Sequence, residues 1–158
     1  MPMLEQRIQQ QFFESADLLS QTAEALAKPI AAATQALLGC ITAGGKVMLC
    51  GSGASAALAS HGAALMIGRF ERERPGLAAL AVGGATEVQA LGAPGDVLLT
   101  ISAGSPEPAL VAAVVAAQAK DMTIVALTGV DAGSLLERLS ETDVHVVVPH
   151  ERAARILE

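Results

Sequence analysis

The chain has 158 residues and a mass of 16.0 kDa, which favours a single domain. With 52% hydrophobic and 16% charged residues it is not a disordered tail, and its net charge of −6 argues against non-specific electrostatic binding to nucleic acid or anionic membrane. Aromatic residues make up only 2%, so the core must be built from Ala, Val, Leu and Ile, and we expect such a chain to associate with other subunits.

The cysteine content and the N-terminus indicate the cell compartment. Cys40 and Cys50 cannot form a disulfide framework and suggest a reducing environment. The first residues, MPMLEQRIQQQFF, have polar side chains where a signal peptide needs its apolar region. Apolar runs such as residues 109–117 are too short to cross a bilayer. We therefore expect a cytoplasmic protein without a membrane span.

The N-terminal region predicts two helices. Residues 4–27 contain no Gly or Pro, and apolar side chains recur on one stripe, at Leu4, Ile8, Phe12, Leu19 and Leu26. Proline at 29 is suited to the first turn of a second helix, which the two glycines at 44 and 45 would end. This helical pair is expected to cover a sheet or to pair with another subunit.

The rest of the chain alternates short β-rich runs with Ala-rich helical stretches. This alternation predicts an α/β fold with a parallel sheet covered on both faces. The expected strands are residues 47–50, 77–82, 97–101, 123–127 and 144–148, and the expected helices are residues 55–69, 107–120 and 133–139. The connection at residues 83–91 is short for a crossover between parallel strands, so it is either unusually compact or lacks a segment.

Ligands of such sheets bind at the carboxyl ends of the strands. Those ends are residues 51–55, 83–86, 102–107 and 128–131, all rich in Gly, Ser or Thr. We therefore predict a binding site there before any family is considered.

The first candidate for an anion-binding loop is CGSGAS, which follows a strand and opens a helix. Gly51 and Gly53 would let backbone N–H groups approach an anion, and Ser52 and Ser55 would add hydroxyl donors. Tight strand-to-helix turns also use glycine for steric reasons alone, so this motif by itself favours neither interpretation.

The second candidate is ISAGSPEP, at residues 101–108. Ser105 is suited to an N-cap, Pro106 to the first helical position and Glu107 to the first turn. A carboxylate there gains about 0.3–1 kcal/mol from the helix N-terminus, which is a sufficient structural reason for it. The same carboxylate would occupy the field that a phosphate needs.

Other polar residues have structural interpretations. The histidine at 61 is expected to be a partly buried structural residue, and that at 145, between two valines of a strand, to lie on an exposed face. Cys50 is interpreted as a core residue, since no basic neighbour in sequence lowers its pKa. The charge run at residues 69–74 is interpreted as solvated surface, with partner binding as the alternative.

Four stretches carry a family resemblance: GKVMLCGSGASAALASHGAALMIGRFERERP, GAPGDVLLTIS, KDMTIVALTGVDAGSL and VVVPHERAARILE. Over residues 4–158 the chain resembles the sugar isomerase (SIS) family, in particular bacterial phosphoheptose isomerases and the DnaA initiator-associating DiaA proteins. The resemblance implies a flavodoxin-like three-layer parallel sheet with an N-terminal helical pair and a homotetramer. Residues 1–158 would form one SIS domain, with oligomerisation helices at 1–44 and the parallel α/β core at 45–158.

The catalytic residues that the resemblance implies are largely replaced. Phosphoheptose isomerases have a glutamate four residues after the histidine that matches His61, and this chain has Leu65 there. Leucine cannot accept the proton that aldose–ketose isomerisation moves. The glutamine of the family's RIQE sequence is Leu157 here, and the family's second catalytic group is a histidine further along the same C-terminal helix. His61 is thus the only catalytic candidate, and because zinc-binding members hold their metal with these positions, we predict neither zinc nor another cofactor.

The phosphate contacts that the resemblance implies are partly kept. The family's S-T-x-G-N-S loop aligns with residues 102–107, so that Ser102 remains while Glu107 replaces the last serine. The family's substrate-facing aspartate falls at about Ala85. The residues predicted to bind a sugar phosphate are Gly51, Ser52, Gly53, Ser55, Ser102, Ser105 and Thr128.

The leading hypothesis is a non-catalytic SIS-domain protein that acts as an oligomeric adaptor. Its partner would be the replication initiator DnaA, it would keep a residual sugar-phosphate pocket, and it would not contact nucleic acid directly. The alternatives are an active phosphoheptose isomerase that converts sedoheptulose 7-phosphate, and a sensor that binds a sugar phosphate without converting it.

Overall fold

The computed structural model describes residues 2–157, so Met1 and Glu158, the ends of the predicted domain, lie outside the described residues. Within this part of the chain, five strands form one parallel sheet in the order β2-β1-β3-β4-β5. The strands are β1 (Val47–Gly51), β2 (Ala79–Ala81), β3 (Val97–Ser102), β4 (Thr123–Thr128) and β5 (Val144–Val147). This order is that of flavodoxin-like sheets, which confirms the predicted fold class. The strands begin and end within a residue of their expected limits, except β2, which is three residues long.

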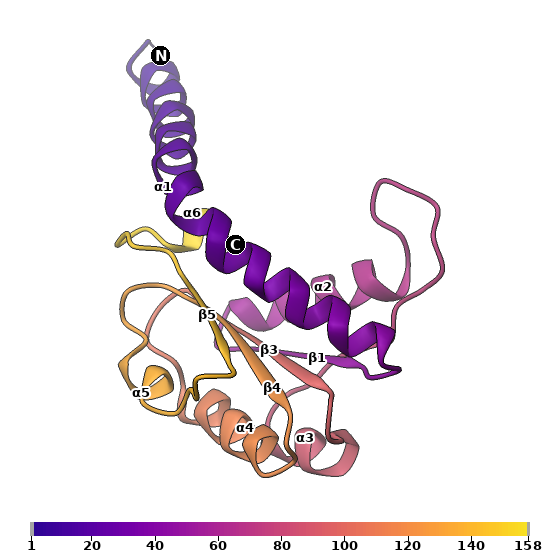
Figure 1. Ribbon diagram of the computed structural model, residues 1–158. Coiled ribbons are helices and arrows are strands. Elements are labelled where there is room, and N and C mark those ends of the chain that lie inside the picture. Colours follow the sequence, from indigo (N-terminus) through magenta and orange to yellow (C-terminus); the bar gives the residue numbers. More distant parts are fainter. Residues whose placement is uncertain (1, 158) are drawn as a thin grey trace.

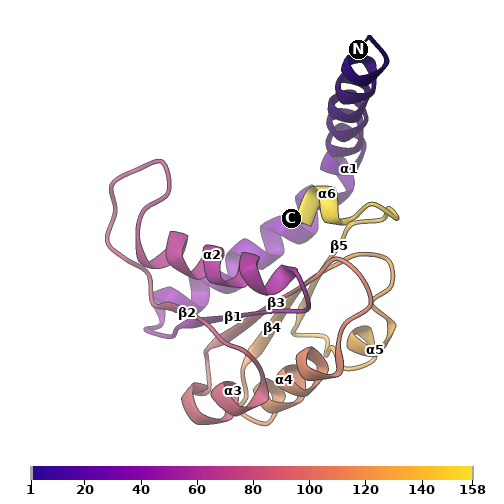
Figure 2. The same cartoon turned by 180° about the vertical axis from the view of Figure 1, so that it is seen from behind.

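Helices cover both faces of the sheet, as Figures 1 and 2 show from opposite sides. Helices α1 (Pro2–Thr42) and α2 (Ser55–Ile67) pack on one face, joined by the short α6 (Ala154–Leu157) at the chain's end. Helices α3 (Ala85–Leu91), α4 (Pro108–Gln118) and α5 (Gly133–Leu136) pack on the other. The domain is therefore a three-layer α/β/α sandwich.

Two hydrophobic clusters hold these layers together, one on each side of the sheet. On the α1 side Leu49 and Val97 contact small residues such as Ala33 and Ala59. On the α4 side Leu98 lies in a cluster with Ala113 and other small residues of α4. Alternate side chains of β3 point to opposite faces, so all six of its residues are buried. Burial on both faces explains why the central strands are continuous apolar runs.

The predicted N-terminal helical pair is wrong, because residues 2–42 form one helix. Pro29 lies inside α1 instead of starting a second helix. A proline in a helix interior removes one backbone hydrogen bond and costs about 3 kcal/mol. Tertiary packing offsets this cost, since Leu26 and Ala33 on either side of the proline are both buried against the sheet. The helix ends where the glycines predicted, with Gly44 in the left-handed region at φ +85°.

Helix α1 also has a composition that the search for short apolar runs overlooked. The stretch Met3–Thr42 is long and apolar enough to cross a membrane, by length and composition alone. Helices of a protein core pass the same test. In this one Leu26, Ala33 and Cys40 are buried against the sheet, which accounts for the apolar character of its C-terminal half.

The connection between β2 and β3 is compact. Its single helix, α3, has seven residues, and Val88 is the residue that this helix buries fully. Gly92 fits closely there, because a Cβ atom would lie 2.6 Å from the carbonyl oxygen of Val88. A short helix thus completes the crossover that the sequence left in question.

An ion pair joins the amino ends of β1 and β3. The buried carboxylate of Asp96 accepts hydrogen bonds from the backbone N–H of Lys46 at 2.9 Å and that of Ala93 at 2.8 Å, and Nζ of Lys46 lies 2.5 Å from Oδ2. Burial by itself raises the pKa of Asp96, but the hydrogen bonds from Lys46 and Ala93 outweigh it and hold the pKa below its ordinary value.

We expect Asp96→Asn to lower the free energy of unfolding at pH 7 by about 1–3 kcal/mol, because the amide carries no charge and one fewer acceptor. Since the folded pKa is lowered, the carboxylate's contribution is present above the unfolded pKa of about 3.9 and is lost as pH falls through the folded value. The difference between wild type and variant in urea unfolding should therefore shrink in acid. Asp131→Asn, at an exposed position, is the control. Equal stability at pH 7 would contradict this role.

A second prediction concerns the threonine in the middle of β3. The Oγ1 atom of Thr100 is buried and has no hydrogen-bond partner among the described residues. Thr100→Val keeps the shape and removes the unpaired hydroxyl, so we expect unfolding free energy to rise by about 1 kcal/mol. Thr128→Val is the matched comparison, because the buried hydroxyl of Thr128 is hydrogen-bonded to His145. Its removal should lower the free energy of unfolding by about 1 kcal/mol. A loss of stability in Thr100→Val would show that this hydroxyl has a partner.

Candidate functional site

The two candidate anion-binding loops meet at the carboxyl edge of the sheet, where the strand order reverses between β1 and β3. The backbone N–H of Ser52 donates to the carbonyl of Ile101 at 3.0 Å, and the backbone N–H of Glu107 donates to Oγ of Ser52 at 3.0 Å. In flavodoxin-like sheets this reversal is the place where ligands bind. The structure therefore brings residues 51–55 and 102–107 to one crevice, as the sequence predicted.

The two glycines of the first loop have different reasons to be there. A Cβ atom on Gly51 would lie 2.1 Å from the carbonyl oxygen of Ser55, so this glycine is required by the tight turn alone. Gly53 has φ +57°, and a Cβ atom there would lie 3.5 Å from Oε1 of Glu107. The carboxylate of Glu107 thus lies over the first loop. Ser55, at the start of α2, is buried.

The second loop differs from its expected form. Helix α4 begins at Pro108, and Glu107 is its N-cap, with φ −69° and ψ 151°. Because the residue before a proline is disfavoured in the helical region, Pro108 moves the helix start beyond Ser105 and Pro106. Ser105 is an exposed loop residue instead of the N-cap. Ser102 is buried, and its hydroxyl donates to the carbonyl of Gly104 at 2.9 Å.

Thr128 lies at the carboxyl end of β4, beside the second loop. The next residue, Gly129, donates its N–H to the carbonyl of Ser102 at 3.1 Å. The hydroxyl of Thr128 is 2.7 Å from Nε2 of His145; the threonine is buried and the histidine is half-buried. His145 is half-buried on the sheet face opposite α1, so the expectation that it lies on an exposed strand face is only partly met. Burial lowers the pKa of His145.

The catalytic candidates do not gather in this crevice. His61 is exposed on α2, about 9 Å along the helix axis from Ser55, so the expectation of partial burial is wrong. Leu65 follows one turn later and is half-buried. Leu157, on α6, lines an apolar hollow over the sheet with Leu26 of α1. The described chain thus offers no general base beside the two loops at the positions that the resemblance indicated.

The charged side chains in or directly after the four strand-end loops are all acidic. Glu107 and Asp131 lie within the loops, Glu87 follows the loop at residues 83–86, and none of the four loops contains lysine or arginine. Glu87 accepts a hydrogen bond from the backbone N–H of Gly83 at 3.3 Å. Burial raises the pKa of the Cys50 thiol to about 11, and Glu87 adds to the rise, which agrees with the interpretation of Cys50 as an unreactive core residue.

No group of three or more His, Cys, Asp and Glu side chains that could hold a metal ion occurs within the described chain. The sequence-based expectation that this chain binds no zinc remains a prediction.

The charge run lies in the loop between α2 and β2, which projects from the body in Figures 1 and 2. Arg74 donates to the carbonyls of Leu65 at 2.7 Å and Met66 at 2.9 Å, so it satisfies the C-terminal end of α2. Arg69 forms an exposed ion pair with Glu73. The rest of the run is exposed, as the surface interpretation predicted.

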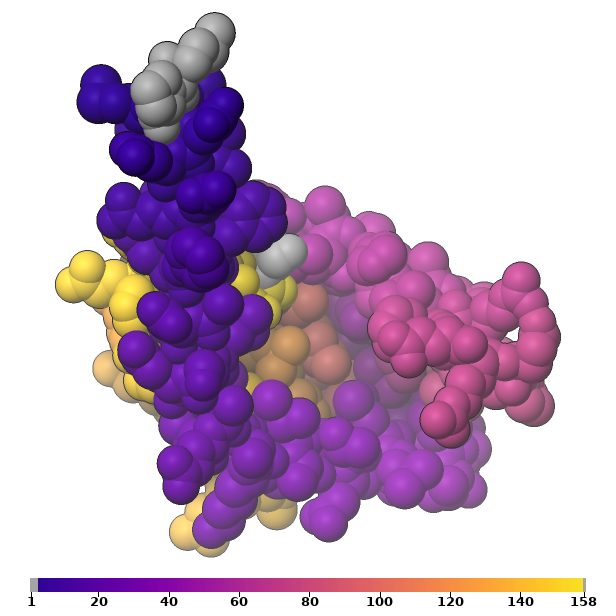
Figure 3. Space-filling model, turned by 90° about the horizontal axis from the view of Figure 1, so that it is seen from above, coloured from indigo at the N-terminus to yellow at the C-terminus, as the bar shows by residue number. Residues whose placement is uncertain are grey.

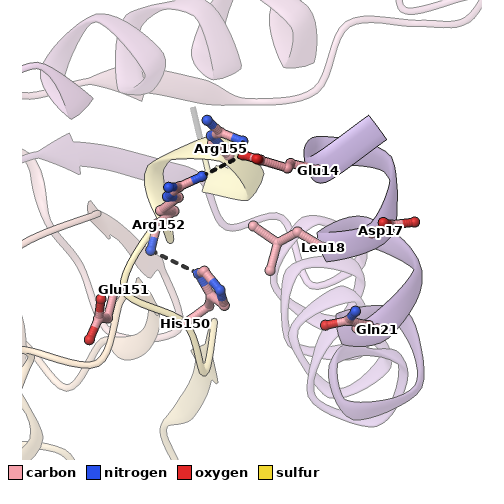
Figure 4. A pocket seen from close by; sticks show the side chains of 8 residues that line it. All are labelled: Glu14, Asp17, Leu18, Gln21, His150, Glu151, Arg152 and Arg155. Atoms are coloured by element: carbon pink, nitrogen blue, oxygen red, sulfur yellow. Dashed lines mark hydrogen bonds and ion pairs between the residues drawn. The ribbon is translucent and has the colours of Figure 1, made fainter. Parts of the chain in front are cut away.

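Sequence reasoning missed a polar pocket of about 380 Å³ between α1 and the residues around α6. Figure 4 shows Glu14 of α1 facing Arg152 and Arg155. Oε2 of Glu14 lies 2.8 Å from Arg152 and 3.6 Å from Arg155, and the hydrogen bond from Arg152 holds the pKa of Glu14 below its ordinary value. These partners are 138 residues or more apart, so no local spacing could have indicated them.

Comparisons with known proteins identify the family of this chain. A model described as SIS domain matches residues 11–90. The chain is 58% identical to a phosphoheptose isomerase of Methylibium petroleiphilum, over all of this chain and 88% of the relative. It is 44% identical to a DnaA initiator-associating protein DiaA of Yersinia pestis, over 99% of this chain and 88% of the relative. The chain belongs to the SIS domain family.

A solved structure agrees with this assignment. Phosphoheptose isomerase GmhA from Neisseria gonorrhoeae superimposes with a TM-score of 0.87 at 36% identity, covering 98% of this chain and 90% of that one. The alignment with the Methylibium protein runs over 176 positions, whereas this chain has 158 residues. The Methylibium relative therefore has residues at positions where this chain has a gap. The relatives therefore share the whole fold but include both named isomerases and named initiator-associating proteins.

The position of Glu107 over the first loop generates a prediction. We expect Glu107→Ser to bind sedoheptulose 7-phosphate about tenfold more tightly than wild type, since it removes a like charge and adds a hydroxyl donor. Isothermal titration calorimetry measures the change. Glu137→Ser, an exposed glutamate at the C-terminal end of α5, is the matched control. Unchanged affinity in Glu107→Ser would remove this loop from the phosphate site.

Proposed function

We propose that this SIS-domain protein does not catalyse isomerisation and acts as an oligomeric adaptor with a weak sugar-phosphate cradle. The observation that carries the proposal is Glu107, whose carboxylate lies over the Gly53 backbone in the crevice between β1 and β3. A sugar phosphate bound there would meet this negative charge, and the two loops at residues 51–55 and 102–107 contain no lysine or arginine to offset it.

The replacement of the family's glutamate on α2 supports the non-catalytic part of the proposal. Moving a proton next to a carbonyl needs a group that can accept it within hydrogen-bond reach. The resemblance to phosphoheptose isomerases implies such a group one helical turn after His61, where this chain has Leu65. His61 faces solvent, and no hydrogen bond to another of the described residues orients its ring.

The partner that we propose is a protein. Relatives 44% identical to this chain are named DnaA initiator-associating proteins, which supports a replication initiator of the DnaA type as partner. The acidic chain, with net charge −6, would then act on the initiator and not on DNA. Self-association into a homotetramer in the cytoplasm belongs to the same proposal, because an adaptor that presents several copies of one surface gains avidity.

One observation favours the rival function. The relative that is 58% identical is named a phosphoheptose isomerase, and the identity exceeds that to the DiaA proteins. In that case other residues would replace the base at Leu65. A sugar-phosphate sensor is the intermediate case, in which the cradle binds its ligand without turnover.

Incubation of the purified chain with sedoheptulose 7-phosphate separates these functions. We expect no loss of ketose above the rate of buffer alone, and the same result for His61→Ala. Turnover that His61→Ala abolishes would establish the isomerase. Calorimetric titration with the same sugar phosphate and co-sedimentation with purified DnaA complete the test. Sub-millimolar ligand binding without DnaA binding would establish the sensor. A chain that shows neither isomerase activity nor binding to DnaA would contradict the adaptor.

A further inference from the structure

The polar pocket of about 380 Å³ beside α1 has no part in the function proposed above. It lies between α1 and the segment at residues 150–155, and Figure 3 shows the yellow atoms of that C-terminal segment against the indigo helix. It shares no residue with the loops at 51–55 and 102–107, so it is distinct from the crevice. Pockets that hold small molecules have volumes of about 300–1,000 Å³, so its size is that of a ligand site.

The α1 wall of the pocket is acidic. Four residues at spacings of three and four positions share one face of the helix and line this wall: Glu14, Asp17, Leu18 and Gln21. Two of the four are carboxylates, and none is a cation. Leu18 is buried, and Figure 4 shows its side chain directed toward the opposite wall. The helix therefore presents negative charge around one apolar side chain.

The opposite wall is mainly basic. It contains two arginines and a histidine beside a single carboxylate: Arg152, Arg155, His150 and Glu151. Nδ1 of His150 accepts the backbone N–H of Arg152 at 2.9 Å, so the neutral ring carries its proton on Nε2 and is a donor there. The side chain of Arg152 is 55% exposed, and of its five N–H donors the contact with Glu14 uses one. This wall has donors available for a carboxylate.

Glu14 shows that a carboxylate fits the basic wall. Its Oε2 atom lies 2.8 Å from Arg152 and 3.6 Å from Arg155, and this contact closes one end of the pocket. Arg155 also donates to Oγ of Ser15 at 3.3 Å and to Oε1 of Gln11, so its guanidinium is directed at α1. Arg152 is therefore the arginine that can take a carboxylate from outside the chain.

A pocket with one acidic and one basic wall favours a ligand that has both charges. A phosphate would meet the carboxylates of α1, and a polyamine would meet Arg152 and Arg155, so each gains on one wall and loses on the other. A zwitterion forms charge-assisted hydrogen bonds with both walls. An α-amino acid has its ammonium and carboxylate on one carbon atom, and an aliphatic side chain can then lie against Leu18.

We propose that this pocket binds an α-amino acid with an aliphatic side chain. The ligand's carboxylate pairs with Arg152 and His150, its ammonium pairs with Asp17, and its side chain contacts Leu18. Because the pocket is open to solvent and salt screens its charges, the dissociation constant is about 0.1–1 mM and rises with ionic strength. The inference does not depend on the proposed adaptor function.

Three ligands of the same shape test the two charges. L-leucine has both, 3-methylbutylamine lacks the carboxylate, and 4-methylpentanoate lacks the ammonium. In isothermal titration calorimetry on the full chain at pH 7, leucine should bind and each analogue should bind at least about tenfold more weakly. Equal affinity for 4-methylpentanoate would make the pocket an anion site, and equal affinity for the amine would make it a cation site. Either result would overturn the proposal.

Variants of the two walls place the ligand. Arg152→Gln and Asp17→Asn change exposed side chains, and each should weaken leucine binding at least about tenfold. In Arg152→Gln, leucine should also lose its advantage over 3-methylbutylamine, because its carboxylate no longer has its main partner. The exposed Arg138→Gln and Asp131→Asn are the matched controls outside the pocket and should bind leucine as wild type does.

Circular dichroism melting curves confirm that each variant is folded. Glu107→Ser, which changes the crevice, should leave the affinity for leucine unchanged, so failure of the amino-acid site is distinguishable from failure of the phosphate cradle. No binding of leucine by wild type up to about 10 mM would overturn the proposal. Binding that neither Arg152→Gln nor Asp17→Asn weakens would place leucine elsewhere and would overturn it as well.

Discussion

The hydrogen bonds that join β1 to β3 outside their ladder determine where the rest of the domain lies. At the amino ends, the Asp96 carboxylate binds the backbone and side chain of Lys46. At the carboxyl ends, Ser52 donates to Ile101 and accepts from Glu107. From this pair the chain leaves β1 toward α2 on one face and leaves β3 toward α4 on the other. The crevice between the two departing loops follows from that divergence.

The crevice has the backbone geometry of an anion-binding site, but the side-chain charge within it is negative. Gly53 and the start of α2 present the positive end of a helix, where an anion is stabilised. Glu107 supplies that anion from within the chain. A carboxylate near a helix start gains about 0.3–1 kcal/mol, which favours the empty site over one that must hold a phosphate beside the same carboxylate. Fold and charge therefore indicate different ligands for this crevice.

The sheet could be predicted from sequence because each strand is a short apolar run that glycine, serine or threonine ends, and this pattern has local causes. The loops could be placed for the same reason. Pro29 was wrongly predicted to begin a second helix, because the packing of Leu26 and Ala33 outweighs the local cost of a proline in a helix interior. The exposure of His145 and of His61 differs from the sequence-based expectation, because burial depends on which elements pack over each position. The contacts of Glu14 with Arg152 and Arg155 join opposite ends of the chain and leave no pattern in either segment.

The scarcity of aromatic residues has a structural reason. Alanines on α2 and α4 let these helices lie close to the sheet, but each buries little apolar area and so contributes little transfer free energy. The three phenylalanines, which would contribute most, all lie on the surface. A chain arranged in this way leaves part of its apolar surface exposed in the single copy. In the proposed oligomer the stability of the chain would be coupled to its concentration, because partners that bind only the folded chain stabilise it by mass action.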